Sequence, residues 1–236
     1  MSQQSSRIIV ALDFPDASQA LALVDTLSPA LCRLKVGKEL FTIAGPDLVR
    51  ALVDRGFDVF LDLKFHDIPN TVNKAVAAAC KLGVWMVNVH ALGGRYMLQA
   101  AREAVDQHDD ENRPLLIAVS ILTSTDAEGL RELGINKSIE QTVTDLTGLA
   151  LDSGIDGMVC SAQEVEALRQ RFGDAPVLVT PGIRPVGTSQ DDQHRIMTPE
   201  KAIELGSSYL VIGRPVTQHA QPAEILARIN ETLAIP

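Results

Sequence analysis

The 236-residue sequence is poor in cysteine, and no pattern ties its cysteines to a metal or to disulfides. Cys32, Cys80 and Cys160 are odd in number and far apart, so they match neither paired zinc spacing nor a disulfide framework. We expect three small, buried hydrophobic side chains in a reducing compartment, where free thiols persist.

The sequence also lacks long apolar runs and clusters of basic residues. No segment approaches the roughly 20 apolar residues that a membrane-spanning helix needs. The net charge of −9, without a Lys/Arg-rich run, argues against a nucleic-acid partner but leaves room for a small anionic ligand. The polar start, MSQQSS, does not resemble a signal peptide, and residues 1–6 are expected to form a frayed terminus. We therefore predict a cytoplasmic protein with no membrane or nucleic-acid partner.

Sequence motifs for common cofactors are absent as well. The sequence contains no H-E-x-x-H or C-x-x-C metal motif. The segment after the first apolar run, ALDFPDA, has no G-x-G, so the dinucleotide-binding fingerprint is missing. The sequence therefore shows no metal-binding constellation and no fingerprint for a nicotinamide or flavin cofactor.

Short apolar, β-branched segments recur along the whole chain. Each is almost continuously apolar, as expected for strands that are covered on both faces. They span residues 7–13, 32–37, 58–64, 85–91, 115–122, 156–161, 177–183 and 209–215.

Helical patterns separate these segments. Asp16 and Ser138 are N-cap candidates, Ser161 and Glu164 have capping-box spacing, and Pro199 follows Thr198 as a first-turn proline. Glycines end several of the patterns, as helix C-caps often do. The predicted helices span residues 16–27, 45–56, 68–83, 138–154, 161–173 and 198–206.

Alternation of strands and helices predicts an α/β protein with a parallel sheet. Eight such units in 236 residues favour a single (β/α)8 TIM barrel that forms one domain, residues 1–236. An open doubly wound sheet is the alternative, and the missing glycine fingerprint weighs against it. The longest irregular stretch, residues 184–196, is polar and contains glycine, which is typical of a lid or binding loop.

Polar residues mark the ends of the predicted strands. In a barrel of this type the active site lies at the carboxyl ends of the strands. The polar or glycine residues at or just after those ends are Asp13, Lys35, Gly37, Asp62, Lys64, Asn88, His90, Thr123, Gly182, Arg184, Gly213 and Arg214.

Four charged residues gather around the third predicted strand. Asp62 and Lys64 are two positions apart and so share one side of the strand, Lys35 ends the neighbouring strand, and Asp67 follows on the loop. We expect an alternating array, in which the carboxylates keep both lysines protonated. That state disfavours a Schiff-base lysine and suits a lysine that donates a proton to a carbanion. The alternative is a buried ion-pair network that only ends the strand.

Two further features of this region are weaker indications of a site. Asp62 and Asp67 have the chemistry of Mg²⁺ ligands, but the adjacent lysines would repel the ion. His66 and His90 are expected to be hydrogen-bonded structural histidines rather than catalytic ones.

Glycine–arginine pairs at the last two strand ends suggest a phosphate site. The segments TPGIRP and IGRP, which contain Arg184 and Arg214, each place a glycine one or two positions before an arginine. Glycine lets backbone N–H groups approach an anion, and arginine binds its oxygens in pairs. Phosphate sites of these barrels often use the loops after strands 7 and 8. The alternative interpretation is that these glycines only form turns and these arginines only lie on the surface.

The segment FLDLKFHDIPNTV, residues 60–72, resembles the signature of the orotidine 5'-phosphate decarboxylase family, which is built on Asp-x-Lys-x-x-Asp-Ile. The likeness covers essentially the whole chain, because ALD, RLKVGKELF, VHALGG, ILTS, VTPGIRP, DQHRIMTP and VIGRP follow in order. It implies a bacterial-type enzyme that converts orotidine 5'-phosphate to uridine 5'-phosphate, the last step of de novo pyrimidine synthesis, without metal or organic cofactor.

The resemblance also implies residue roles. Lys64 would protonate C6 as carbon dioxide leaves, Asp62 would lie beside the substrate carboxylate, and Asp67 would come from the partner chain of a homodimer. Lys35 and Asp13 would contact the ribose. The remaining implied substrate contacts are Ile68, Thr71, Thr123, Pro181, Arg184, Gln193, Gly213 and Arg214.

Two rival functions stay open at this point. One is a Mg²⁺-dependent sugar-phosphate decarboxylase or aldolase of a related barrel family, which would need further acidic ligands. The other is a non-catalytic nucleotide-binding barrel. The cationic Lys35 disfavours the first, and the intact Lys64 disfavours the second.

Overall fold

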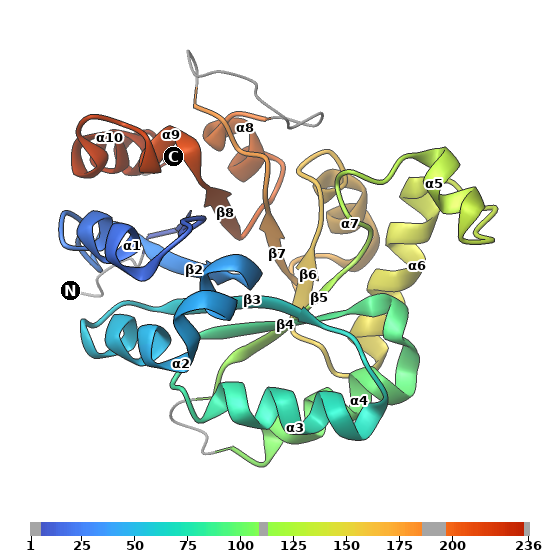
Figure 1. The fold of residues 1–236 in the computed structure, drawn as a ribbon. Coiled ribbons are helices and arrows are strands. Elements are labelled where there is room, and N and C mark those ends of the chain that lie inside the picture. Colours follow the sequence, from blue (N-terminus) through green and yellow to red (C-terminus); the bar gives the residue numbers. More distant parts are fainter. Residues whose placement is uncertain (1–5, 109–112, 186–196, 234–236) are drawn as a thin grey trace.

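The computed structural model describes residues 6–108, 113–185 and 197–233. These residues form a closed parallel barrel in which the strands pair in chain order and β8 returns to β1. Figure 1 shows the helices arranged around the strands. The predicted TIM barrel is therefore confirmed. The strands are β1 (Ile8–Ala11), β2 (Arg33–Gly37), β3 (Val59–Phe65), β4 (Met86–His90), β5 (Leu115–Val119), β6 (Gly157–Val159), β7 (Val177–Thr180) and β8 (Tyr209–Ile212).

Every predicted apolar segment contains a strand, but most strands end earlier than predicted. The segment 115–122 is a strand only to Val119, and the segment 209–215 only to Ile212. The last residues of these segments have left the ladder and follow the strands at the barrel mouth. Arg214 accordingly begins the short helix α9 (Arg214–Thr217) instead of ending a strand.

Several predicted helix starts are confirmed by their capping hydrogen bonds. Asp16 accepts the N–H of Gln19, and Ser138 accepts the N–H of Gln141. Thr198 likewise accepts the N–H of Lys201, with proline in the first turn. These caps begin α1 (Ala17–Val24), α6 (Ile139–Asp152) and α8 (Pro199–Glu204).

Other helices differ from the prediction. The α-helix predicted from Ser161 begins at Val165, although Glu164 still accepts the N–H of Ser161 at 2.8 Å as a capping box does. Helix α2 (Lys38–Asp54) is interrupted at Gly45 (φ 67), so the predicted segment 45–56 corresponds to its second part. The remaining helices are α3 (Pro69–Cys80), η1 (Ala91–Gly93), α4 (Gly94–Asp106), α5 (Ala127–Glu132), α7 (Val165–Phe172) and α10 (Pro222–Leu233).

The buried side chains form two separate apolar cores. One lies between the strands and the surrounding helices. The other fills the barrel itself and is built by alternate strand residues such as Phe60, Met86 and Ile117. Because side chains alternate along a strand, Asp62 and Asn88 continue the inward-facing rows of Phe60 and Met86 toward the mouth. No described helix is both long enough and apolar enough to cross a bilayer.

Arg33 closes the inner core at the amino end of the barrel. Its guanidinium lies 4.4 Å from the centroid of the Trp85 ring and 4.9 Å from that of Tyr209. It also bonds Asp58 and the carbonyl of Ser6. Ser6 is buried and bonds Asn230 of α10, so the predicted frayed terminus 1–6 is wrong at Ser6. Residues 1–5 lie outside the described residues.

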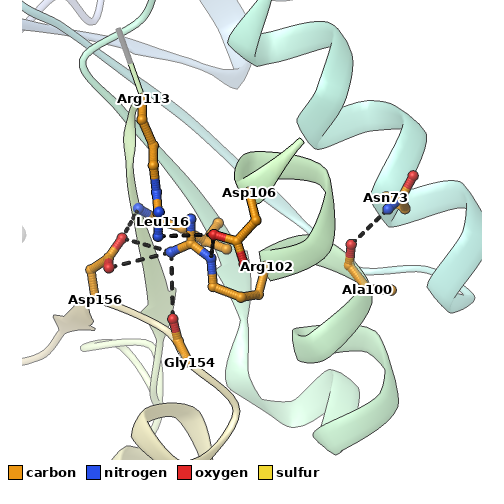
Figure 2. Close-up of polar contacts among 8 residues, drawn as sticks. All are labelled: Asn73, Ala100, Arg102, Asp106, Arg113, Leu116, Gly154 and Asp156. Atoms are coloured by element: carbon orange, nitrogen blue, oxygen red, sulfur yellow. Dashed lines mark hydrogen bonds and ion pairs between the residues drawn. The ribbon is translucent and has the colours of Figure 1, made fainter. Parts of the chain in front are cut away.

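A buried arginine joins α4 to the loops below β5 and β6 (Figure 2). Arg102 is 8% exposed, and its guanidinium lies 3.1 Å from Asp156 and 3.0 Å from Asp106. Asp156 also accepts the N–H of Leu116, the second residue of β5. Arg113 forms a second ion pair with Asp106. The cluster thus links a helix to two strand starts that are distant in sequence.

Replacement Arg102→Met should lower the free energy of unfolding by about 2–3 kcal/mol, because it leaves Asp156 without its buried cation and leaves Asp106 paired with Arg113 alone. The partial exposure of both carboxylates keeps this value below that of a fully buried pair. Urea unfolding at fixed protein concentration measures the change. Arg50→Met, which removes an exposed pair with Asp47, is the matched control and should change stability by less than about 0.5 kcal/mol. Equal effects of the two variants would contradict the structural role of Arg102.

Candidate active site

Two adjoining cavities lie at the mouth of the barrel. The larger, about 650 Å³, is lined by the ends of β1, β7 and β8, including Asp13, Arg184 and Arg214. The smaller, about 190 Å³, is mostly apolar and is lined by the ends of β3, β5 and β6. Lys35, Asp62, Pro181 and Val211 line both. The charged residues therefore lie where a polar cavity meets an apolar one.

A row of ion-paired side chains crosses this junction. Lys35 Nζ lies 3.2 Å from Asp13 and 3.4 Å from Asp62 Oδ2. Lys64 Nζ lies 2.6 Å from Asp62 Oδ1. The side chains of Lys35 and Asp62 are only 10% and 13% exposed. Asp62 is thus held between two ammonium groups, one on each oxygen.

The electrostatics of this arrangement keep Asp62 ionised. Burial acts to raise the pKa of Asp62, but the charges of Lys35 and Lys64 and the hydrogen bonds from Lys64 and Asn88 outweigh it. The net result is a pKa below the ordinary 3.8. At neutral pH the site therefore presents a carboxylate to any ligand that enters the smaller cavity.

The predicted fourth member of the array differs in the structure. Asp67 is exposed, and its carboxylate accepts the N–H of Ile68 at 2.6 Å. Among the described residues it forms no ion pair with Lys64, and Asp13 instead extends the array at its other end. Ile68 and Thr71 are also exposed and line neither of the two cavities.

The other predicted contacts divide between the two cavities. Arg184, Gly213 and Arg214 line the larger cavity, and Thr123 lines the smaller one. Arg184 is 8% exposed, so its charge is largely shielded from water. Gln193 lies outside the described residues. Two arginines beside Gly213 can bind an anion, as the sequence pattern indicated.

Comparison with known proteins identifies the family. A family model described as orotidine 5'-phosphate decarboxylase / HUMPS matches residues 6–229. The chain belongs to this family.

Individual relatives are similar over nearly their whole length. A protein of Vibrio atlanticus named orotidine 5'-phosphate decarboxylase is 58% identical over 97% of this chain and 98% of its own. One of the same name from Pseudoalteromonas translucida is 55% identical, with 98% of each chain covered. A solved structure titled orotidine 5'-phosphate decarboxylase from Lactobacillus acidophilus superposes with a TM-score of 0.87 at 37% identity, covering 97% of this chain and 99% of that one.

Sequence reasoning missed much of the cavity lining of this family member. Phe14, Gln19, Thr217 and Gln218 line the larger cavity. The apolar wall of the smaller one was also missed, and it consists of Phe60, Val119, Ile121, Leu122, Val159, Cys160 and Val211. The inward alternation of strand residues indicates several of these positions, whereas the loop and helix residues carry no such signal. Cys160 is buried, as predicted for all three cysteines, and it also faces the apolar cavity.

The two histidines lie side by side near this site, with ring centroids 5.6 Å apart. The expectation of a hydrogen-bonded structural histidine is wrong for Nδ1 of His90, which is buried and has no hydrogen-bond partner among the described residues. Burial, and then the charges of His66, Lys38 and Lys64, lower the pKa of His90 to about 4. His90 is therefore neutral at physiological pH.

This lowered pKa predicts a pH dependence of stability. Between pH 6.5 and about 4 the unfolded chain protonates this histidine and the folded chain does not, so the free energy of unfolding falls as pH falls. The His90→Gln variant should lose the part of the pH dependence of the free energy of unfolding that comes from this histidine. Urea unfolding between pH 6.5 and about 4 measures this change. NMR titration should show His90 protonating near pH 4, and an ordinary midpoint near 6.5 would contradict the assignment.

Proposed function

We propose that the chain decarboxylates orotidine 5'-phosphate to uridine 5'-phosphate and carbon dioxide, the last step of de novo UMP synthesis, with Lys64 as the proton donor. The observation that carries this proposal is the row of ion-paired side chains Lys35–Asp62–Lys64 at the junction of the two cavities. The names of relatives at 55–58% identity support the same substrate.

The geometry supports a simple sequence of steps. In the proposed reaction Asp62, as a carboxylate, lies beside the carboxylate of the substrate, and this repulsion is relieved as carbon dioxide leaves. The electron pair of the broken bond remains on C6 as a carbanion. Lys64, an ammonium 2.6 Å from Asp62, then gives its proton to C6 and is reprotonated from solvent. One proton is taken up and one carbon dioxide is released per turnover.

The two cavities suit the two ends of this substrate. We assign the phosphate to Arg184, Gly213, Arg214 and Gln193, and the ribose to Asp13 and Lys35. The pyrimidine would enter the apolar cavity next to Thr123 and Pro181. Phosphate binding far from C6 then supplies energy for assembling the charged site.

The rival functions fit the site less well. A Mg²⁺-dependent sugar-phosphate enzyme needs acidic ligands, yet Lys35 lies 3.4 Å from Asp62 and Lys64 lies 2.6 Å from it. Among the described residues no three His, Cys, Asp or Glu side chains form a metal-binding group. A non-catalytic nucleotide-binding barrel would have no use for Lys64 in this setting. We therefore propose a reaction without metal or organic cofactor.

A cytoplasmic location is part of the proposal. The three cysteines are buried and unpaired, which suits a reducing compartment.

The first test follows ultraviolet absorbance during incubation with orotidine 5'-phosphate. The wild-type protein should convert the substrate at the same rate with and without chelator. Lys64→Ala should lower kcat by about 10³-fold or more, because it removes the proposed proton donor to C6. The matched control is Lys137→Ala, which removes an exposed pair with Asp145 and should retain full activity.

Two outcomes would overturn this assignment. Activity lost in chelator and restored by Mg²⁺ would favour the sugar-phosphate rival. Turnover close to wild type by folded Lys64→Ala would remove the lysine from the mechanism.

We also propose that the enzyme is a homodimer in which Asp67 completes the partner's site. Asp67 is exposed on the loop after β3 and turns to its own backbone. Large apolar side chains are exposed after the neighbouring strands β2, β3 and β4: Ile43 (59%), Ile68 (66%), Leu92 (41%) and Tyr96 (81%). Exposed apolar groups on one side of the mouth favour a two-fold interface.

Complementation between two inactive variants tests this arrangement. Lys64→Ala and Asp67→Ala homodimers should each be nearly inactive. A mixed dimer has one intact site and one site with both defects. Unfolding and refolding the two variants together should therefore restore about a quarter of wild-type activity, as expected if roughly half of the dimers are mixed. A mixture that stays inactive although heterodimers are shown to form would place Asp67 in its own chain's site.

A further inference from the structure

The end of β3 does not pair regularly with β4. Leu61 pairs with Val87 and Phe65 pairs with Val89, so three residues of β3 lie opposite a single residue of β4. That single residue is Asn88, which is fully buried. The three residues opposite it include Asp62 and Lys64, and the irregularity therefore lies within the charged site itself.

The irregularity leaves Lys64 in an unusual backbone conformation. Its φ of 53° makes it the only described residue other than glycine with a positive φ. L-residues rarely adopt this region, and such conformations persist when the surrounding structure holds them. The expected contact between Lys64 and Asp62 is thus made from a backbone conformation that a regular strand does not have.

The amide of Asn88 holds both charged residues. Its Oδ1 accepts the backbone N–H of Lys64 at 2.8 Å, the donor that the interrupted ladder would otherwise leave unpaired. Its Nδ2 donates to Asp62 Oδ1 at 2.7 Å, the same oxygen that contacts Lys64 Nζ. The other carboxylate oxygen, Asp62 Oδ2, forms an ion pair with Lys35. One side chain thus fixes the backbone of the proton donor and the rotation of the adjacent carboxylate.

We propose that Asn88 is a positioning residue for decarboxylation, which sets Lys64 and Asp62 in the geometry that the proposed function requires. Asn88 lines neither of the two cavities, so it acts through these two residues and not on the substrate. The phosphate and ribose contacts lie on other strands. Loss of Asn88 should therefore lower kcat and leave KM and product binding nearly unchanged.

The first variant removes the amide. Asn88→Ala should lower kcat by about 100-fold, the effect of displacing a reacting group by about 1 Å. Its KM, and the Kd for uridine 5'-phosphate from calorimetry, should stay within about threefold of wild type. Thr180→Val is the matched control, because it removes a buried hydroxyl on β7 that bonds Ser207 and Tyr209 and does not touch the charges. The control should retain wild-type kcat.

A second variant keeps the volume and tests the hydrogen bonds directly. In Asn88→Asp a protonated carboxyl can donate to Asp62 and accept from Lys64, as the amide does, whereas the ionised form repels Asp62. Asp62 and Lys64 face the new group from β3, and Lys35 lies beyond Asp62. His90 is on the same strand as the new group, and the residue opposite on β5 is the apolar Ile117. Two close carboxylates titrate in two steps, and their repulsion raises the pKa of the second step. The kcat of this variant relative to wild type should therefore fall as pH rises.

The outcomes separate this inference from the proposed function. Wild-type protein that does not act on orotidine 5'-phosphate would refute the function. If the wild type is active but a folded Asn88→Ala keeps kcat within about threefold, the positioning role is refuted alone. The positioning role is also refuted if the kcat of Asn88→Asp relative to wild type does not change with pH. This measurement can be made even if the alanine variant fails to fold.

Discussion

The carboxylate of Asp62, buried between two ammonium groups, is the constraint on which the site depends. A buried carboxylate is unfavourable unless it is paired, and here Lys35 lies at one oxygen and Lys64 at the other. The pairing keeps Asp62 charged and keeps both lysines in place. A charged carboxylate beside an ammonium is also what decarboxylation with protonation requires, so the interactions that stabilise the array and those that serve the proposed reaction are the same.

The barrel supplies the rigidity that this array needs. Phe60 and Met86 belong to the inner core, and the next inward residues on their strands are Asp62 and Asn88. Arg33, stacked on Trp85 and Tyr209, closes the opposite end. The charged groups thus rest on a packed column of side chains, and their positions follow from strand register rather than from flexible loops.

The loops complete the site in two directions. The glycine and arginine residues after β7 and β8 line the polar cavity and suit a phosphate. The loop after β3 turns Asp67 outward, near the exposed Ile68, and this direction is what favours a shared site in a dimer. The barrel mouth therefore combines a ligand-binding side with the side on which we propose that a second copy of the chain binds.

The sequence by itself determined the barrel and most charged site residues, because apolar runs, caps and glycines act locally and recur in order. It also placed Lys35, Asp62 and Lys64 on the strands, and Arg184 and Arg214 near the ends of the last two strands, although Arg214 in fact begins α9. Only the tertiary structure decided the irregular pairing opposite Asn88, the positive φ of Lys64 and the apolar wall of the smaller cavity. These features depend on register and packing between strands distant in sequence, which no local pattern encodes.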